Sequence, residues 1–387
     1  MQGKAENHFD YTLMAPGPVN LHPKVREILA HPMIHHRTPE FDKILAQALK
    51  RLKIVFQTEQ PVYALSSTGS GGMEVLLVNT LSPGDSILVV NSGKFGERWA
   101  EMARTFGVQV DELKITWGQA VTPEHIAEKL KTKTYHAVLT QACETSTGVL
   151  HPIQKLGAVI KNYQHTLFLV DGITALGAVP LPMDEWSIDG LVGGSQKAFM
   201  LPTGMSFVSF SKKAHARFEH AKIPKFYFDI RKEIAANAKG ETFFSSNVSL
   251  IKALNYVLAE IESAGLAPLF KTIQRRADFV AYLMETLGLS SYAAVKSASL
   301  TAVALPNSTD GQKLRELMEV DFNLTVMGGQ DQAKGKIIRI GHMGYIQDKD
   351  QMHLATALYH SLQKLNMTPS ISFIDFQTQM KNWLAQN

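Results

Sequence analysis

Apolar and polar residues alternate along the chain in two distinct rhythms. Continuous apolar runs, typical of buried strands, occur at residues 62–66, 86–91, 108–115, 135–140, 166–171, 189–194 and 205–210. Between them, apolar residues recur every three or four positions and predict helices at residues 72–81, 95–106, 123–131 and 152–163. Strands that alternate with helices in this way predict an α/β fold with a mainly parallel, seven-stranded sheet covered on both faces.

The last two predicted strands break this rhythm. Residues 194–204 join them without a helix, and such a connection is too short for the crossover that parallel strands need. One strand of the sheet is therefore predicted to run antiparallel to its neighbours.

Helical patterns flank the sheet region, at residues 22–30, 41–56 and 248–263. The stretch Gly265-Leu-Ala-Pro268 then marks a boundary. Beyond it the pattern predicts a helix at 269–287, strands near 299–305 and 336–341, and helices at 310–319 and 347–364. We therefore expect an N-terminal arm (residues 1–20), a large domain (21–264) and a smaller α+β C-terminal domain (265–387).

The composition is that of a globular protein large enough for more than one domain, with 387 residues, 45% of them hydrophobic and 19% charged. The net charge of +4 is spread along the chain, which does not favour a nucleic-acid partner. No apolar run reaches the ~18–20 residues that a membrane span needs. The one cysteine, Cys143, excludes an internal disulfide and fits a reducing compartment. Because the first residues are polar rather than a secretory segment, we expect a cytoplasmic protein.

Lys197 is the first candidate for chemistry, because it lies between two apolar runs and follows the small residues Gly193, Gly194 and Ser195. Burial lowers the pKa of a lysine and makes its amine nucleophilic, as an aldehyde-bearing cofactor requires. A surface lysine at the end of a strand is the alternative, so the interpretation depends on neighbouring features.

Two such features are present. Asp171 closes a predicted central strand, where its carboxylate can hold a pyridinium nitrogen protonated. The turn Ser67-Thr-Gly-Ser-Gly-Gly72 joins a strand to a helix, and its free N–H groups suit a phosphate, although it is not a Walker A loop. Lysine, carboxylate and phosphate loop together predict a pyridoxal phosphate site.

The order of motifs along the chain resembles one known family. The motifs are Pro16-Gly-Pro18, Thr68-Gly-Ser-Gly, Lys94-Phe-Gly-Glu-Arg98, Glu144-Thr-Ser-Thr-Gly148, Val170-Asp-Gly172, Gly194-Ser-Gln-Lys197 and Arg339-Ile-Gly-His-Met-Gly344. They look like those of the class V pyridoxal phosphate aminotransferases, most of all the alanine–glyoxylate, serine–glyoxylate and serine–pyruvate group. The resemblance covers about residues 13–365. It implies a fold-type I architecture and transfer of an amino group from alanine or serine to glyoxylate or pyruvate by a ping-pong mechanism.

The resemblance also implies a role for individual residues. Lys197 matches the lysine that forms a Schiff base with the cofactor and later moves the proton between substrate Cα and cofactor C4′. Asp171 matches the partner of the ring nitrogen. Arg339 matches the arginine that receives the substrate carboxylate, which a guanidinium can pair through two parallel hydrogen bonds.

Other positions match cofactor contacts in the family. Phosphate contacts are implied for Thr68, Gly69, Ser70 and Gln196, and contacts to the ring or its phenolic oxygen for Phe95, Ile173 and Ser146. Related desulfurases and lyases tend to have histidine at the position of Phe95, so Phe95 favours transamination. Read without the resemblance, Phe95 would be a core residue, and Gln196 and Ser146 ordinary polar residues at strand ends.

The family often completes its phosphate site with residues of a partner subunit, so a homodimer with shared active sites is expected. The matching segment is Glu241-Thr-Phe-Phe-Ser-Ser-Asn247. Phe243 or Phe244 replaces the usual hydroxyl-bearing aromatic residue, which leaves Ser245 as the expected phosphate ligand.

Several alternatives remain open at this point. The donor could instead be ureidoglycine, phosphoserine or aminoethylphosphonate, or the protein could be a β-eliminating lyase or desulfurase, which needs a cysteine on a mobile loop. A non-catalytic subunit of a redox assembly is a third interpretation, because the pattern Lys94-Phe-Gly-Glu-Arg98-Trp occurs in chains labelled as hydrogenase subunits. The sequence assigns no role to His35, His36 or His342, and no cluster has metal-ligand spacing.

Overall fold

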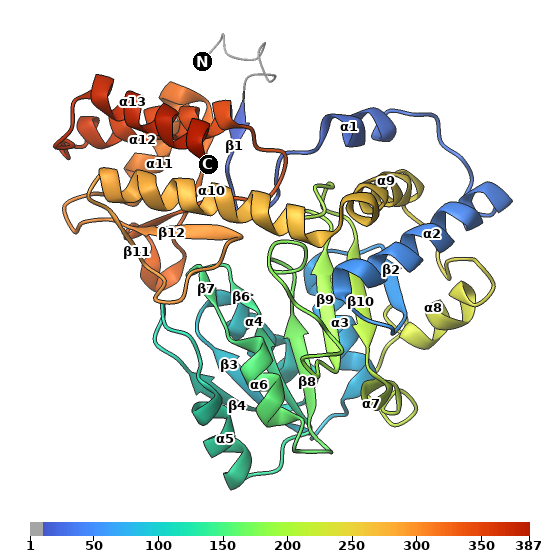
Figure 1. Ribbon diagram of the computed structural model, residues 1–387. Helices are drawn as coiled ribbons and strands as arrows, with labels where there is room; N and C mark the ends of the chain where they lie inside the picture. The colour runs from blue at the N-terminus through green and yellow to red at the C-terminus, as the bar shows by residue number, and fades with distance from the viewer. Residues whose placement is uncertain (1–10) are drawn as a thin grey trace, which may run out of the picture.

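The structure is a computed structural model that describes residues 11–387, so the first half of the predicted N-terminal arm lies outside the described residues. Its main sheet has seven strands in the order β2-β10-β9-β8-β5-β3-β4 (Figure 1). Their bounds are β2 (Val62–Leu65), β3 (Ser86–Asn91), β4 (Gln109–Lys114), β5 (Ala137–Gln141), β8 (Leu167–Asp171), β9 (Gly190–Gly194) and β10 (Ser206–Phe210). Six of these strands run in one direction and β10 runs in the opposite direction, which confirms the predicted mainly parallel sheet.

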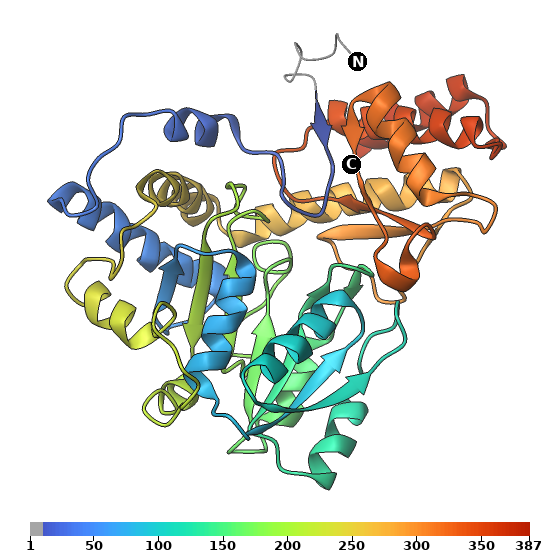
Figure 2. The same cartoon turned by 180° about the vertical axis from the view of Figure 1, so that it is seen from behind.

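Helices cover both faces of this sheet. One face packs against α2 (Pro39–Phe56), α5 (Pro123–Thr132), α6 (Ile153–Ile160) and α9 (Val248–Ala264). The other packs against α3 (Gly69–Thr80), α4 (Lys94–Thr105), α7 (Lys212–His215) and α8 (Ile230–Asn237), and Figure 2 shows α3 and α4 in front of the strands. Alternate residues of each strand join opposite cores, because strand side chains point to the two faces in turn.

The helix α3 begins three residues before its predicted start. The sequence pattern excludes residues 69–71, because glycine is a poor helix former. The glycine-rich first turn is accommodated by tight packing instead, since a Cβ on Gly72 would lie 2.5 Å from a side-chain carbon of Val192. Close contact between α3 and β9 therefore requires glycine there.

The smaller region is a four-stranded antiparallel sheet packed against helices. Its order is β11 (Ser290–Ser291), β12 (Leu300–Ala304), β15 (Ile337–Gly341) and β14 (Met327–Gly328). The helices are α10 (Leu266–Thr286), α11 (Gly311–Phe322), α12 (Asp348–Lys364) and α13 (Phe373–Gln386). Helix α13 was not predicted, because its buried residues form only a narrow stripe of Phe376, Met380 and Leu384.

The N-terminal segment connects the two regions. β1 (Thr12–Leu13) pairs in parallel with β13 (Leu324–Thr325), and Met14 lies in the apolar core of the smaller region. The chain then crosses to α1 (Pro23–Leu29), which lies beside α9 (Figure 1). Two short pieces complete the fold: the hairpin of β6 (Cys143–Glu144) and β7 (Val149–Leu150), and the 3-10 turn η1 (Asp331–Ala333). Across residues 11–387, none of the helices combines the length and the apolar character needed to cross a bilayer.

Candidate active site

The loops that carry most of the predicted site residues meet at one edge of the main sheet. β2, β3, β5, β8 and β9 all run in the same direction, so their carboxyl ends lie along the same edge. These ends lead into the residues predicted for the site, namely Thr68, Gly69, Ser70, Phe95, Ser146, Asp171, Ile173, Gln196 and Lys197. This is the edge at which open α/β sheets bind ligands.

Lys197 lies in the connection between β9 and β10 and is only 7% exposed. Its Nζ donates a hydrogen bond of 2.6 Å to the carbonyl oxygen of Pro16, and no carboxylate among residues 11–387 forms an ion pair with it. Burial lowers the pKa of Lys197 to about 8, although the charge of Asp171 acts in the opposite direction. Gly17 leaves room for this amine, because a Cβ there would lie 2.5 Å from Nζ. Lys197 is therefore a buried amine covered by the N-terminal segment, not a surface lysine.

Asp171 ends the central strand β8 and is 5% exposed. Its Oδ1 accepts a hydrogen bond of 2.8 Å from the N–H of Ile173, while Oδ2 has no hydrogen bond to any described residue. Burial raises the pKa of Asp171 to about 6; the N–H of Ile173 lowers it, and the charge of Glu144 raises it further. A cationic group at Oδ2 would stabilise the ionised carboxylate.

The N-terminus of α3 lacks the side-chain cap that usually satisfies its first N–H groups. Thr68 occupies the N-cap position, but its side chain forms no capping hydrogen bond. Gly69 lies against Ile173, since a Cβ on Gly69 would approach Cδ1 of Ile173 to 2.6 Å. Nearby on β9, a Cβ on Gly194 would contact both Ile173 and the amide oxygen of Gln196. That oxygen is buried and has no hydrogen-bond partner among the described residues.

Phe95 and Ser146 are connected by Glu144, a residue to which the sequence assigned no role. The Glu144 carboxylate accepts hydrogen bonds from the backbone N–H groups of Phe95 and Gly96 at the start of α4. The Ser146 hydroxyl donates to Glu144 over 2.5 Å and accepts from the N–H of Lys94 over 3.0 Å. The single hydroxyl proton of Ser146 is therefore directed at Glu144.

Arg98 is a second residue that sequence reasoning missed. Its Nη1 donates to the hydroxyl of Ser70 over 3.0 Å, and its guanidinium lies 4.7 Å from the centre of the Phe95 ring. It forms no ion pair with any residue that the structure describes. The contact between Arg98 and Phe95 could have been predicted from the sequence, because residues three apart share one face of a helix.

Arg339 brings the smaller region into contact with the site edge. It lies on β15, is 7% exposed, and burial lowers its pKa to about 10. Its Nε donates to the carbonyl oxygen of Gly328 over 2.9 Å, and its Nη1 donates to that of Thr145 over 3.0 Å. Its Nη2 forms no hydrogen bond to a described residue and can bind an anion.

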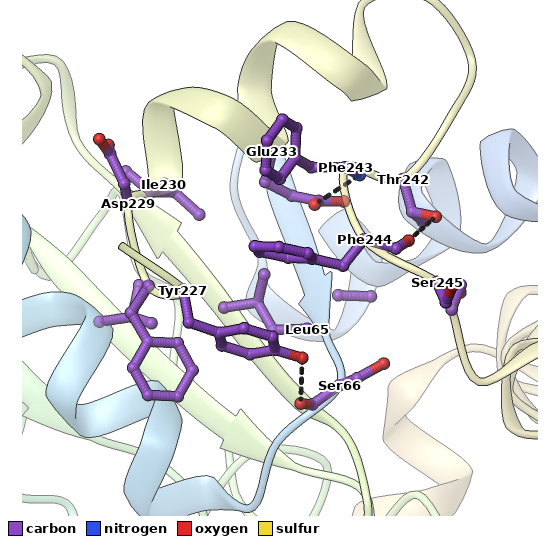
Figure 3. Close-up of a pocket in the computed structure, with 14 residues that line it drawn as sticks. Leu65, Ser66, Tyr227, Asp229, Ile230, Glu233, Thr242, Phe243, Phe244 and Ser245 are labelled. Carbon is purple, nitrogen blue, oxygen red and sulfur yellow. Dashed lines mark hydrogen bonds between the residues drawn. The ribbon is translucent and has the colours of Figure 1, made fainter. Parts of the chain in front are cut away.

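The structure does not bring Ser245 together with these residues. Ser245 is exposed at the rim of a separate pocket of about 470 Å³, whose lining includes neither Lys197 nor Asp171 (Figure 3). In this pocket the ring of Phe244 stacks on Tyr227 at 4.5 Å. The Tyr227 hydroxyl donates to the carbonyl oxygen of Ser66 over 3.3 Å, next to the predicted phosphate loop.

Two of the three histidines without an assigned role, His35 and His342, differ in their surroundings. His35 is exposed, and its neighbour Arg37 pairs with Glu241 over 2.9 Å. His342 is buried, and its Nε2 lies 2.8 Å from the hydroxyl of Thr301. Within residues 11–387 no group of three or more His, Cys, Asp and Glu residues could hold a metal ion.

Comparison with known proteins agrees with this arrangement. The family model described as "Aminotransferase class-V" matches residues 26–350. The chain belongs to the class V aminotransferases. It is therefore an enzyme that uses pyridoxal phosphate, and its fold is that of the fold-type I aminotransferases.

Three similar proteins illustrate the range of names in this class V group. The "Soluble hydrogenase 42 kDa subunit" of Anabaena cylindrica is 38% identical over 89% of this chain and 91% of its own. The L-aspartate–glyoxylate aminotransferase of Paracoccus denitrificans is 34% identical over 87% of each chain. The crystal structure of alanine–glyoxylate aminotransferase from Nostoc sp. has a TM-score of 0.88 and 28% identity, and the match covers 94% of this chain and 98% of that one.

The residues of this class V aminotransferase fit the cofactor that the family uses. The uncapped N-terminus of α3 suits the phosphate group, because its free N–H groups can donate to phosphate oxygens. The free Oδ2 of Asp171 suits a protonated ring nitrogen, and the buried amine of Lys197 suits the aldehyde. These residues thus leave groups available for three different parts of pyridoxal phosphate.

Proposed function

We propose that this aminotransferase moves the amino group of alanine or serine to glyoxylate or pyruvate in two half-reactions. The observation that carries the proposal is Arg339, a buried arginine with one free nitrogen at the same edge as Lys197 and Asp171. One such arginine suits a substrate with a single α-carboxylate. Relatives named for alanine–glyoxylate and serine–glyoxylate transfer support the choice of substrates.

Each residue then has a definite task. The bound cofactor supplies an electron-withdrawing ring that makes the substrate Cα proton acidic. Asp171 would hold the proton on the ring nitrogen, Lys197 would hold the cofactor covalently and carry the Cα proton, and Arg339 would fix the substrate carboxylate. Phe95 and Ile173 cover the ring and exclude water. Thr68, Gly69, Ser70 and Gln196 bind the phosphate, and Ser146 stays close to the phenolic oxygen.

A dicarboxylic donor such as aspartate is the second candidate. Arg98 favours it, because this half-buried guanidinium has no carboxylate partner among the described residues and lies against Phe95. The relative named L-aspartate–glyoxylate aminotransferase supports the same donor class. If Arg98 binds a second carboxylate, Arg98→Gln will raise KM for aspartate and leave KM for alanine unchanged.

The other interpretations have less support. A desulfurase needs a reactive thiolate, whereas Cys143 is buried in β6 and burial raises its pKa to about 12. A non-catalytic role is suggested only by relatives named as hydrogenase subunits. Lys197, Asp171 and Arg339 are all present, and a chain without catalysis has no need of their costly burial.

We further propose a cytoplasmic homodimer in which Ser245 of each chain serves the phosphate site of the other. Phe226, Tyr227 and Phe243 are exposed around the Ser245 segment, which suits a contact between subunits. Mixed dimers of Lys197→Ala and Ser245→Ala chains test this arrangement. Shared sites would leave one intact site in each mixed dimer and restore about half the activity. Sites contained within one chain would leave no intact site.

Absorption spectroscopy tests the main proposal. The purified protein should show the visible band of bound pyridoxal phosphate. Alanine or serine without an acceptor should abolish this band, and glyoxylate should restore it. A cofactor band that neither donor changes would overturn the proposed donors, and the same experiment with aspartate would then test the second candidate.

A further inference from the structure

We propose that Glu144 is a positioning residue that fixes Phe95 against the cofactor ring. The inference rests on the proposed role of Phe95 and adds a residue that acts through it. Glu144 belongs to the short strand β6, follows β5 closely and is completely buried.

The start of α4 depends on this carboxylate. Gly93 occupies the N-cap position of α4 and has no side chain with which to cap it. The carboxylate of Glu144 takes that place, with its Oε2 3.1 Å from the N–H groups of both Phe95 and Gly96. A side chain at Gly93 could not serve instead, since a Cβ there would lie 2.6 Å from Cδ of Glu144. A distant residue thus provides the cap that helices usually take from their own N-cap residue.

This distant cap differs from a local one in what it connects. A local cap would satisfy the first N–H groups of α4 but would not connect them to the sheet. Glu144 also accepts from the side-chain amide of Gln141 over 2.9 Å and from the N–H of Ser146 over 3.1 Å. Gln141 is the last residue of β5, so the carboxylate joins the first turn of α4 to the end of a central strand.

The groups around Glu144 require an ionised carboxylate. All of them donate hydrogen bonds, and the N-terminus of α4 adds the positive end of a helix dipole. Burial raises the pKa of Glu144, and the hydrogen bonds from Ser146, Gly96 and Phe95 act in the opposite direction. Glutamine at this position would turn an amide N–H₂ toward one of these donors and would break at least one bond.

The hydrogen bonds of Glu144 continue through Gln141 to residues farther from the site. Gln141 also donates to the hydroxyl of Ser92 over 3.2 Å, and that hydroxyl lies 2.8 Å from Nε2 of His151. The N–H of Val121 donates to Nδ1 of the same ring, so His151 is neutral and carries its proton on Nε2. The whole chain of bonds is buried, which leaves the carboxylate little freedom to move.

A double-mutant cycle on cofactor affinity tests the proposal. Glu144→Gln should raise the Kd of pyridoxal phosphate about tenfold, equivalent to about 1.4 kcal/mol, and should weaken the visible circular dichroism of the bound cofactor. Phe95→Ala should weaken binding by itself. In the Phe95→Ala background, Glu144→Gln should change Kd by less than about twofold, because the ring through which Glu144 acts is absent.

Two further variants keep the test decisive. Glu112→Gln is the matched control, because Glu112 binds Arg104 near the other end of α4; it should lower the melting temperature without changing Kd or the dichroism. If Glu144→Gln does not fold, Gln141→Met removes one donor to the carboxylate, and we expect a two- to threefold higher Kd that disappears with Phe95→Ala.

The outcomes separate this inference from the proposed function. Equal losses of affinity in the presence and absence of the Phe95 ring would overturn the inference while leaving the proposed function intact. Failure of the unmodified protein to bind pyridoxal phosphate would overturn the proposed function and the inference together.

Discussion

Two buried aspartates, one at the amino edge and one at the carboxyl edge of the main sheet, differ in the number of hydrogen bonds they accept. At the amino edge, Asp189 precedes β9 and is 6% exposed. It accepts hydrogen bonds from the N–H of Phe168 over 2.9 Å, the hydroxyl of Ser211 over 2.6 Å and Nζ of Lys213 over 3.1 Å. At the carboxyl edge, Asp171 is as deeply buried but accepts one hydrogen bond, from the N–H of Ile173.

This difference distinguishes a carboxylate that stabilises the fold from one that remains available to a ligand. A buried carboxylate without partners is costly, so a sheet selected only for stability would satisfy both edges alike. At the carboxyl edge Lys197 has no carboxylate partner, and the Gln196 amide oxygen has no partner among residues 11–387. Buried titratable groups without an ionic partner, at the edge where α/β sheets bind ligands, indicate where a ligand completes the structure.

The largest expected difference in rate is between substitution of Lys197 at the carboxyl edge and substitution of Lys213 at the amino edge. Lys197→Ala should lower the rate of glyoxylate-dependent transamination by at least about 10⁴-fold, because both the covalent link and the proton carrier are lost. Lys213→Ala should keep its rate within about twofold and melt at a lower temperature, because Asp189 loses its cation. Steady-state rates and thermal melts of both variants check this contrast. A slow but substantial turnover by Lys197→Ala would remove Lys197 from the mechanism.

Substitutions of the two aspartates should show the same contrast, with a smaller loss of activity. Asp171→Asn should lower kcat/KM about 10²- to 10³-fold while the protein without cofactor stays folded, since a neutral amide cannot hold the ring nitrogen protonated. Asp189→Asn should lower the free energy of unfolding by about 1–3 kcal/mol and leave kcat/KM of the folded enzyme nearly unchanged. Urea unfolding and initial rates measure the two quantities. Loss of activity in both variants to the same degree would contradict a division of labour between the edges.

Much of this contrast could be predicted from sequence because it depends on local pattern. Apolar runs gave the seven strands of the sheet, and Asp171 and Lys197 each adjoin such a run. The roles of Glu144 and Pro16 could not be predicted, because they depend on contacts between distant parts of the chain. Pro16 and Lys197 are 181 residues apart, and no periodic pattern reports such a pairing. Glu144 was visible only as the first residue of a motif, since its function is to cap a helix that starts elsewhere.

A third contrast compares the buried Arg339 with the half-buried Arg276, both in the smaller region. Arg276 is satisfied by the carbonyl oxygens of His342, Gly344 and Ile346, whereas Arg339 keeps Nη2 free. Arg339→Lys should raise KM for alanine about tenfold or more, because lysine cannot form a bidentate pair. Arg276→Lys should lower the melting temperature and leave KM unchanged. Substrate saturation curves check both variants, and an unaltered KM in Arg339→Lys would place the carboxylate elsewhere.

The smallest effect concerns pH. In the proposed mechanism the neutral form of Lys197 is the nucleophile, and burial lowers the pKa of this lysine to about 8. The rate of covalent cofactor uptake should therefore rise about tenfold per pH unit up to about pH 8 and then level off. Burial also opposes folding while the lysine is charged, so the protein without cofactor should gain stability as pH rises from about 8 toward the ordinary lysine value. Stopped-flow absorbance measures uptake, and a rise that continues to pH 10 would show that Lys197 is not desolvated.

The pairing of β1 with β13 has a consequence for biosynthesis. Tyr11 is hydrogen-bonded to Thr325, 314 residues later, and the same segment places Pro16 over Lys197. At a translation rate of roughly 5–20 residues per second, β1 waits about 15 to 60 s on the ribosome before its partner strand emerges. Lys197 thus lacks this cover until the last part of the protein has been synthesised, which then brings the N-terminal segment over it.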